Sequence, residues 1–181
     1  MHNDIDLNKE ISFETFKKQV LEDYTLLVTS REASLLGRRE VLAGKAKFGI
    51  FGDGKELPQI ALAKVFQKGD FRSGYYRDQT FMMAINELTV KQLFSGLYAN
   101  TDINEEPMSA GRQMGAHFNT PLLNTDGSWK KLIDLKNSSS DVSCTGSQMP
   151  RLLGLAQASK LYRNLDFKNS ENFSNNGNEI A

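Results

Sequence analysis

The sequence is poor in cysteine, in net charge and in long apolar runs. Its single cysteine, Cys144, cannot form a disulfide framework within the chain, which favours a reducing compartment. Lysine plus arginine equals aspartate plus glutamate, at 22 each, so no overall field points to nucleic acid or to an anionic membrane. No apolar stretch approaches the roughly 20 residues of a membrane span, and no signal-peptide pattern opens the chain. We therefore expect a cytoplasmic protein without a nucleic-acid or membrane partner.

What the sequence does contain is a strong helical pattern. After Ser12, which suits an N-cap, apolar residues recur at three- and four-residue steps, and the pattern breaks at Gly44. This predicts one helix of about 30 residues, or two in series, with an apolar stripe along one face. The members of the stripe are Phe13, Phe16, Val20, Tyr24 and Leu27.

Shorter elements are expected further along the chain. They are helices over residues 56–67, around residues 82–85, over residues 89–100 and over residues 147–162, and a short strand over residues 71–76. Thr89 and Gln92 fit a capping box, which marks the start of the third of these helices. Residues 101–142 look mostly irregular, and so long an irregular segment inside a domain is usually functional or disordered.

The sequence divides into three parts. Residues 1–11 are polar and are expected to be loose, residues 12–163 form the expected domain, and residues 164–181 read as a polar loop. About five helices with one or two strands is an odd count for an independent domain. The last residues, 178–181, look like the start of a strand, so we expect the chain to be a segment of a longer protein.

Four segments, in this order, carry a family resemblance. They are residues 54–63, residues 74–78, residues 111–118 and residues 143–150. The first is a turn into a helix, the second reads Gly-Tyr-Tyr-Arg-Asp, the third Gly-Arg-Gln-Met-Gly-Ala-His-Phe and the fourth Ser-Cys-Thr-Gly-Ser-Gln-Met-Pro. In these segments the chain resembles the N-terminal part of the α subunit, or α-type domain, of thiamine-diphosphate-dependent 2-oxo acid dehydrogenases. Gly115 stands where that family often has proline, and Cys144 where proline or an aliphatic residue is usual.

The resemblance implies a fold and a cofactor. The family domain is a parallel sheet with helices on both faces, so this helix-rich α/β segment would hold the first strands of a truncated thiamine diphosphate-binding fold. Tyr76 and Arg77 match positions that contact the diphosphate of thiamine diphosphate, and a phenol and a guanidinium are suitable donors to phosphate oxygens. Ser143 and Thr145 match a turn that meets the aminopyrimidine. The alternatives are a strand end with a snorkelling arginine and an ordinary helix N-cap at Ser147.

His117 matches a histidine that lies near the reacting carbon of the cofactor, which implies a catalytic role. A loop histidine is otherwise usually an exposed or structural group. Arg112 and Gln113 precede it and are expected to contact the substrate, and the Arg-Gln-Met-x-x-His pattern favours a branched-chain 2-oxo acid over pyruvate. Cys144 is expected to be a buried small hydrophobe and not a nucleophile.

A glycine-rich segment, residues 48–54, looks like the start of the family's Mg²⁺ motif. Asp53 is not followed by an asparagine at the distance that the motif requires. The family also places its metal motif after the fourth segment, which would be beyond Ala181. We therefore expect no complete metal site in this chain, although the full-length enzyme would use Mg²⁺ together with thiamine diphosphate.

The resemblance thus implies part of the decarboxylating component of a 2-oxo acid dehydrogenase complex. The complete enzyme would pair with a β-type subunit or fused β-type domain and would pass its acyl group to a lipoyl-bearing acyltransferase. The 181-residue chain alone is expected to be inactive and, with apolar surface exposed, to self-associate. Two alternatives stay open, namely a non-catalytic interaction or scaffold domain that keeps the fold and a pyruvate dehydrogenase-type enzyme. The order of the four segments argues against a transketolase-like protein.

Overall fold

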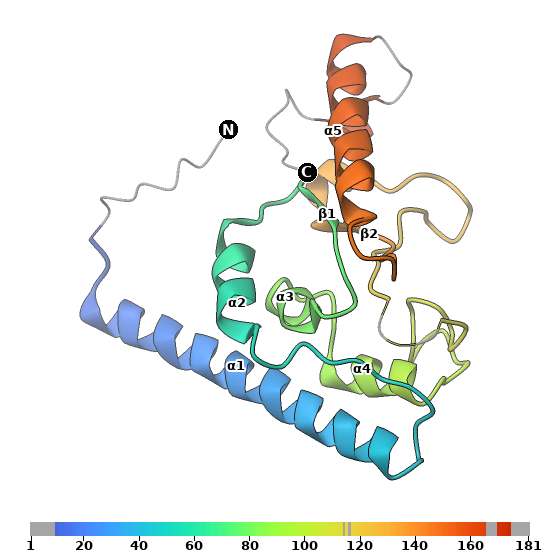
Figure 1. Ribbon diagram of the computed structural model, residues 1–181. Helices are drawn as coiled ribbons and strands as arrows, with labels where there is room; N and C mark the ends of the chain where they lie inside the picture. Colours follow the sequence, from blue (N-terminus) through green and yellow to red (C-terminus); the bar gives the residue numbers. More distant parts are fainter. Residues whose placement is uncertain (1–9, 114, 116, 166–169, 175–181) are drawn as a thin grey trace.

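A computed structural model describes residues 10–113, 115, 117–165 and 170–174 of the chain. In this part of the chain, α-helices and two short strands are joined by long loops (Figure 1). Most of the loose N-terminus expected over residues 1–11 and of the polar loop expected over residues 164–181 lies outside the described residues, as do the strand start expected at 178–181 and the motif residues Met114 and Ala116.

The first helix, α1 (Phe13–Leu42), is a single helix of 30 residues, so the first of the two predicted alternatives is confirmed and two helices in series are not formed. The Ser12 side chain accepts a hydrogen bond from the Thr15 backbone N–H at 3.2 Å and caps the first turn. Gly44 follows the helix in the left-handed region, at φ 74°, which glycine adopts without a Cβ clash. In Figure 1 this helix forms the long base of the molecule, and the next three helices pack against it.

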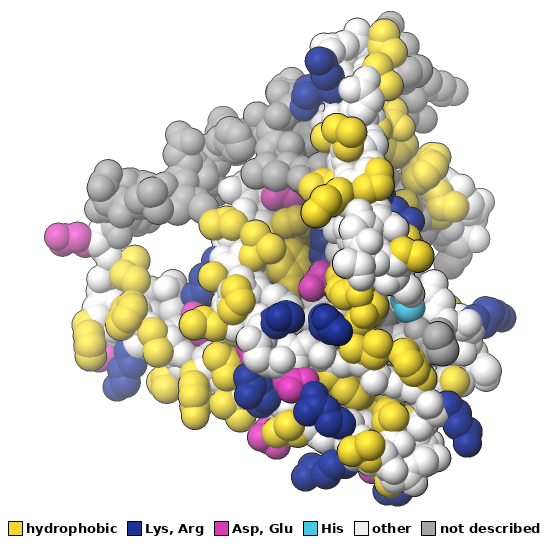
Figure 2. Space-filling view, viewed as in Figure 1, with side chains coloured by type: hydrophobic (Ala, Val, Ile, Leu, Met, Phe, Trp, Pro, Cys, Tyr) yellow, Lys and Arg dark blue, Asp and Glu magenta, His cyan; other side chains and the backbone are white. Residues whose placement is uncertain are grey.

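The two halves of α1 differ in burial. In its second half the buried residues are small, which allows other elements to approach closely, and they are Ser30, Ala33, Ser34 and Gly37. In its first half the predicted apolar stripe is largely exposed, with Phe13 72% and Tyr24 63% exposed. Figure 2 shows hydrophobic side chains gathered over this half of the helix. The described residues therefore do not cover the stripe.

Three short helices complete the helical layer, namely α2 (Glu56–Val65), α3 (Gln79–Ala84) and α4 (Val90–Leu97). The predicted capping box of α4 is confirmed, because the Thr89 hydroxyl accepts the Gln92 N–H at 3.2 Å and the Gln92 side chain accepts the Thr89 N–H at 2.9 Å. The core cluster includes Phe81, Met82, Ile85, Leu88 and Leu93. Met82 is completely buried, so α3 lies at the centre of this core.

The sheet consists of two parallel strands, β1 (Phe71–Ser73) and β2 (Asn137–Ser139). β2 lies within residues 101–142, so the prediction of an irregular segment is wrong for these three residues. The reason is that hydrogen bonds hold this strand, and polar residues such as Asn137 are fully buried in it. The Asn137 side-chain NH₂ group donates to the Leu132 carbonyl oxygen at 2.8 Å, while its Oδ1 is buried without a hydrogen-bond partner among the described residues.

The last helix, α5 (Gln148–Asn164), follows β2, packs against β1 and projects away from the helical layer (Figure 1). Ser147 is its N-cap residue, although its side chain makes no capping hydrogen bond. No residue of α5 itself is buried, and Met149 and Leu153 are 76% and 73% exposed. The short 3₁₀ helices are η1 (Leu132–Asp134) and η2 (Ser170–Asn172).

The described part of the chain is thus helix-rich with a small parallel sheet, which is compatible with the expected α/β class. None of its helices combines the length and the apolar content that crossing a membrane requires.

Candidate functional site

The carboxyl ends of β1 and β2 lie at the same edge of the sheet because the strands are parallel. Residues 74–78 follow β1, and residues 140–147 follow β2 and lead into α5. Ligand sites in parallel sheets form at this edge. The two loops are joined where the Ser73 hydroxyl donates to the Gln148 carbonyl oxygen at 3.1 Å. The second and fourth motif segments are therefore neighbours in space.

The loop after β1 is held from two sides. The Asp78 carboxylate accepts the Tyr75 backbone N–H at 2.9 Å and closes the turn. From α2, the Gln59 side chain donates to the Arg77 carbonyl oxygen at 3.0 Å. A Cβ on Gly52 would lie 2.1 Å from that same oxygen, so only glycine fits there. The first motif segment, which contains Gln59, thus holds the second one in place.

Tyr75, Tyr76 and Arg77 form a cluster of donors in this loop. The two tyrosine hydroxyl oxygens are 2.5 Å apart, and the Tyr75 hydroxyl is 3.4 Å from that of Thr145. The Arg77 guanidinium lies 5.8 and 5.4 Å from the centroids of the two rings. The Arg31 guanidinium, by contrast, forms an ion pair with the Glu56 carboxylate at 2.6 Å. Within the described ranges, the Arg77 guanidinium has no hydrogen bond or ion pair, so it is available for an anion.

The hydrogen bonds in this cluster separate the acidities of the two phenols. Hydrogen bonds with Thr145 and then with Tyr76 lower the pKa of Tyr75. The hydrogen bond with Tyr75 raises the pKa of Tyr76. Tyr76 is therefore the phenol of the pair that keeps its proton to higher pH, and it remains a hydrogen-bond donor.

His117 lies between this cluster and the fourth motif segment. Its Nε2 is 2.5 Å from the Ser143 hydroxyl oxygen, and its ring centroid is 6.4 Å from that of Tyr76. Its Nδ1 is buried and has no hydrogen-bond partner among the residues that the structure describes. The contact with Ser143 fixes the orientation of the ring. Five predicted residues, Tyr76, Arg77, His117, Ser143 and Thr145, are thus brought together, with Tyr75 as a link.

The two predicted substrate residues lie differently. Gln113 lines a cavity of about 20 Å³ together with His117, and its Oε1 is buried without a hydrogen-bond partner in the described part of the chain. The cavity is far smaller than a ligand pocket of ordinary size. Arg112 is exposed and is not among the residues that line this cavity. The structure therefore places Gln113 beside His117, and Arg112 on the outer surface.

The start of the third motif segment is fixed by Glu106, which sequence reasoning missed. Its carboxylate accepts the backbone N–H groups of Met108, Ser109 and Gly111 at 3.0, 2.9 and 2.9 Å. Burial opposes the charged form, but hydrogen bonds from Ser109 and from these backbone groups outweigh it and lower the pKa of Glu106. Gly111 has φ 71°, and a Cβ there would lie 2.5 Å from the Ala99 carbonyl oxygen. This segment therefore needs its glycine.

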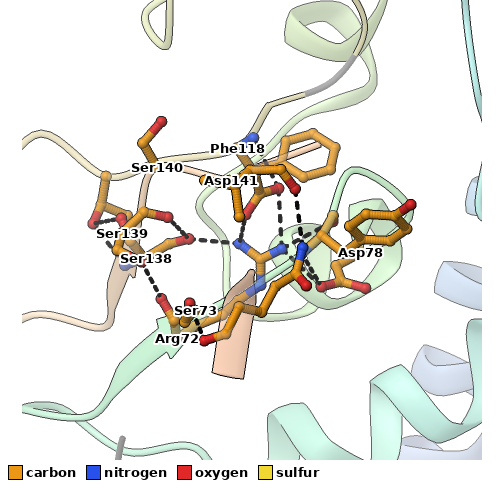
Figure 3. Close-up of polar contacts among 12 residues, drawn as sticks. Arg72, Ser73, Asp78, Phe118, Ser138, Ser139, Ser140 and Asp141 are labelled. Atoms are coloured by element: carbon orange, nitrogen blue, oxygen red, sulfur yellow. Dashed lines mark hydrogen bonds and ion pairs between the residues drawn. The ribbon is translucent and has the colours of Figure 1, made fainter. Parts of the chain in front are cut away.

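A buried ion cluster beneath the loops was also missed (Figure 3). In it, Arg72 of β1 bonds the carboxylates of Asp78 and Asp141 and the hydroxyl of Ser138. The available sequence signal was an arginine, Arg72, inside the strand predicted over residues 71–76, where alternation turns its side chain to the opposite face from Phe71 and Ser73. The sequence signal for Tyr75 was its position directly before Tyr76, which places two phenols in the same loop.

The structure also describes the surroundings of Cys144 and Asp53. Cys144 is exposed, so the expected buried hydrophobe is wrong, because the turn over residues 143–146 faces solvent. Asp53 forms an ion pair with Arg38 at 2.6 Å. Among the described residues there is no group of three His, Cys, Asp or Glu side chains that could hold a metal ion.

These donors suit a diphosphate. The Arg77 guanidinium, which has no hydrogen bond or ion pair among the described residues, lies beside the Tyr75 and Tyr76 hydroxyls at the edge of a parallel sheet. No protein-family model matches the chain, and a search of curated proteins finds no relative. Any function must therefore be argued from the residues of this site.

Proposed function

We propose that the chain is the cofactor-holding segment of the decarboxylating component of a 2-oxo acid dehydrogenase. The observation that carries the proposal is the convergence of its motif segments at one edge of the sheet. Tyr76 and Arg77 come from the loop after β1, Ser143 and Thr145 from the turn after β2, and His117 from the connection between the strands. An ordinary strand end with a snorkelling arginine would not require the second turn to meet the first.

Tyr76 and Arg77 would hold the diphosphate of thiamine diphosphate. The guanidinium offers forked donors and a full positive charge, and the Tyr76 phenol adds a donor that stays protonated. Ser143 and Thr145 would lie against the aminopyrimidine. When bound, thiamine diphosphate supplies the electron sink that decarboxylation of a 2-oxo acid needs.

His117 would bind and orient the 2-oxo acid. The Ser143 hydroxyl at its Nε2 fixes the ring plane, and Gln113 lies in the same cavity wall. The pattern of Arg112, Gln113 and His117 favours a branched-chain 2-oxo acid as the substrate. Mg²⁺ would be held by residues of the full-length enzyme outside this chain, and a β-type subunit or domain and a lipoyl-bearing acyltransferase would be the partners.

A second candidate function is a non-catalytic interaction or scaffold domain. The exposed apolar residues of α1 and α5 favour it, because large exposed apolar patches mark protein–protein interaction sites. Pyruvate as the substrate is a variant of the first proposal and uses the same residues.

Calorimetric titration with thiamine diphosphate and Mg²⁺ tests the proposal, on this chain and on the longer protein that we expect to contain it. We expect binding by the longer protein, weakened at least about 10-fold by Arg77→Met because a charge-assisted contact is lost. The control is Arg38→Met, which removes an exposed arginine paired with Asp53. Absence of binding by both proteins would favour the scaffold. Tight Mg²⁺-dependent binding by the short chain would show that Asp53 was wrongly rejected as a ligand.

A further inference from the structure

We propose that Arg72 is a positioning residue, whose buried guanidinium sets the distance between the Tyr76–Arg77 loop and His117. The inference deepens the function proposed above and rests on it for its meaning in catalysis. Its physical basis is a single side chain that bonds both loops of the site from below, at the carboxyl ends of the two strands (Figure 3).

Arg72 contacts the loop after its own strand at two points. Its Nη2 donates to the Asp78 carboxylate at 2.8 Å and to the Tyr75 carbonyl oxygen at 3.1 Å. The same Asp78 oxygen accepts the Tyr75 N–H. A Cβ on Gly74 would lie 1.8 Å from the Arg72 Cζ, so the loop is folded directly over the guanidinium. The loop that carries Tyr76 is therefore shaped around this cation.

The other side of the guanidinium holds the second strand and the histidine segment. Its Nη1 donates to the Ser138 hydroxyl at 2.6 Å and lies 2.9 Å from an Asp141 carboxylate oxygen. Asp141 in turn accepts the Phe118 N–H at 3.1 Å, and its own N–H donates to the Phe118 carbonyl oxygen at 3.1 Å. Phe118 directly follows His117 in the chain. Arg72 thus links both sides of the site through two carboxylates.

The ion cluster around Arg72 is buried, and burial of charged groups costs free energy, so stability alone does not explain it. The Arg72 side chain is 8% exposed and that of Asp141 is not exposed at all. Replacing buried ions by apolar residues of similar volume is often neutral or stabilising, so the cluster is weak grounds for a stabilising role. The Arg72 guanidinium, in contrast, is planar and has N–H donors in fixed directions, so it can set the positions of several hydrogen-bond partners at once.

The test compares Arg72→Met with the double variant Arg72→Met/Asp141→Leu and with Arg72→Lys, in the longer protein and in this chain. The single methionine variant leaves a buried carboxylate unpaired and is expected to lose stability. The double variant removes both members of the buried Arg72–Asp141 pair and leaves the part-exposed Asp78 carboxylate, so it is expected to recover most of that stability. Arg72→Lys keeps the positive charge but replaces the planar set of N–H donors by a single ammonium group. It therefore distinguishes the effect of the charge from the effect of the donor directions.

Two readouts report position and not stability. The first is thiamine diphosphate affinity, which we expect to fall about 10- to 100-fold in both methionine variants, because the loss of a hydrogen bond between Arg77 and the charged diphosphate has an effect of this size. The second is the imidazole ¹⁵N chemical shift of His117, which senses its contact with Ser143 and is assigned with His117→Gln. The chain has two histidines, so the spectrum is simple. We expect this signal to stay displaced in the double variant.

A double variant that regains the wild-type affinity and the wild-type His117 signal would overturn the inference and leave Arg72 a structural residue only. An unchanged His117 signal in Arg72→Met would overturn it as well. If the wild-type protein does not bind thiamine diphosphate, the proposed function fails, while the His117 signal still decides whether Arg72 positions that residue.

Discussion

The helical layer and the strand-end region of this molecule are held together by different means. Around α3 the core is apolar and closed, Met82 is completely buried, and the buried polar groups of Gln79 and Thr80 bond to the adjacent α1. At the ends of β1 and β2 the contacts are polar, and α5 beyond them contributes no buried residue. Among the described residues, the buried side-chain atoms without a hydrogen-bond partner include Gln113 Oε1 and His117 Nδ1 here and Gln79 Oε1 in α3. The difference teaches that an apolar core defines the first region, whereas polar contacts between distant parts of the chain define the second.

The largest expected effect is in the helical layer. Met82→Ala should lower the free energy of unfolding by about 2–5 kcal/mol, because it removes fully buried atoms and leaves a cavity. Chemical denaturation measures the effect. The matched control is Met149→Ala on α5, where the side chain is 76% exposed and the change should stay within about 0.5 kcal/mol. Equal effects for both methionines would abolish the contrast between the two regions.

A smaller effect is expected at the ion pair that joins α1 to α2. The Glu56 carboxylate accepts hydrogen bonds from Arg31 at 2.6 and 2.9 Å, which, with backbone hydrogen bonds, lower the pKa of Glu56 to about 2. Because the folded-state pKa lies below the ordinary glutamate pKa of 4.5, this stabilisation is present above about pH 4.5 and is lost as the pH falls towards 2.

The variant Glu56→Gln should therefore cost about 1–3 kcal/mol at pH 7, the range for a hydrogen bond to a charged group. Denaturation midpoints of wild type and variant, measured from pH 7 to pH 2, should converge at the acidic end. Arg38→Met, which breaks the more exposed pair with Asp53, serves as the comparison. A difference that stays constant over this pH range would exclude ionised Glu56 as the cause.

The smallest expected effect on stability is on the exposed stripe of α1. Phe16 is 52% exposed, so Phe16→Ser should change the free energy of unfolding by no more than about 0.5 kcal/mol. It should nevertheless reduce the self-association that we expect of the isolated chain, as measured by sedimentation velocity. The substitution Lys17→Ser on the same helix is the control. A chain that is monomeric before any substitution would contradict the expected self-association.

The helical layer could be predicted from the sequence because its signals are local. The side chains of Ser12 and Thr89 cap helices within three residues of their own positions, and periodic apolar residues mark what lies between. The length of α1 was predicted for this reason. What could not be predicted is which part of its apolar face would be covered, since that depends on where α2 and α3 pack.

The strand-end region was predicted less completely because its contacts are distant in sequence. β2 consists of Asn137, Ser138 and Ser139, a composition that favours a turn, and only its partner strand and its hydrogen bonds make it a strand. The link from Arg72 to Asp141 spans 69 positions and leaves no periodic pattern. The candidate site residues were proposed from motif order, and Tyr76 and His117 belong to the motifs whereas Arg72 does not.

The parallel pairing of β1 with β2 also has a consequence for how the chain folds. The contact between Arg72 and Ser138 closes a loop of 66 positions, and the entropy lost on closing so long a loop must be offset before the polar contacts form. The contact between Ser30 of α1 and Thr80 of α3 spans 50 positions as well, but each helix of the layer first forms through hydrogen bonds that are local in sequence. We therefore expect the helical layer to form early and the strand ends, with the whole candidate site, to assemble in the last and slowest step of folding.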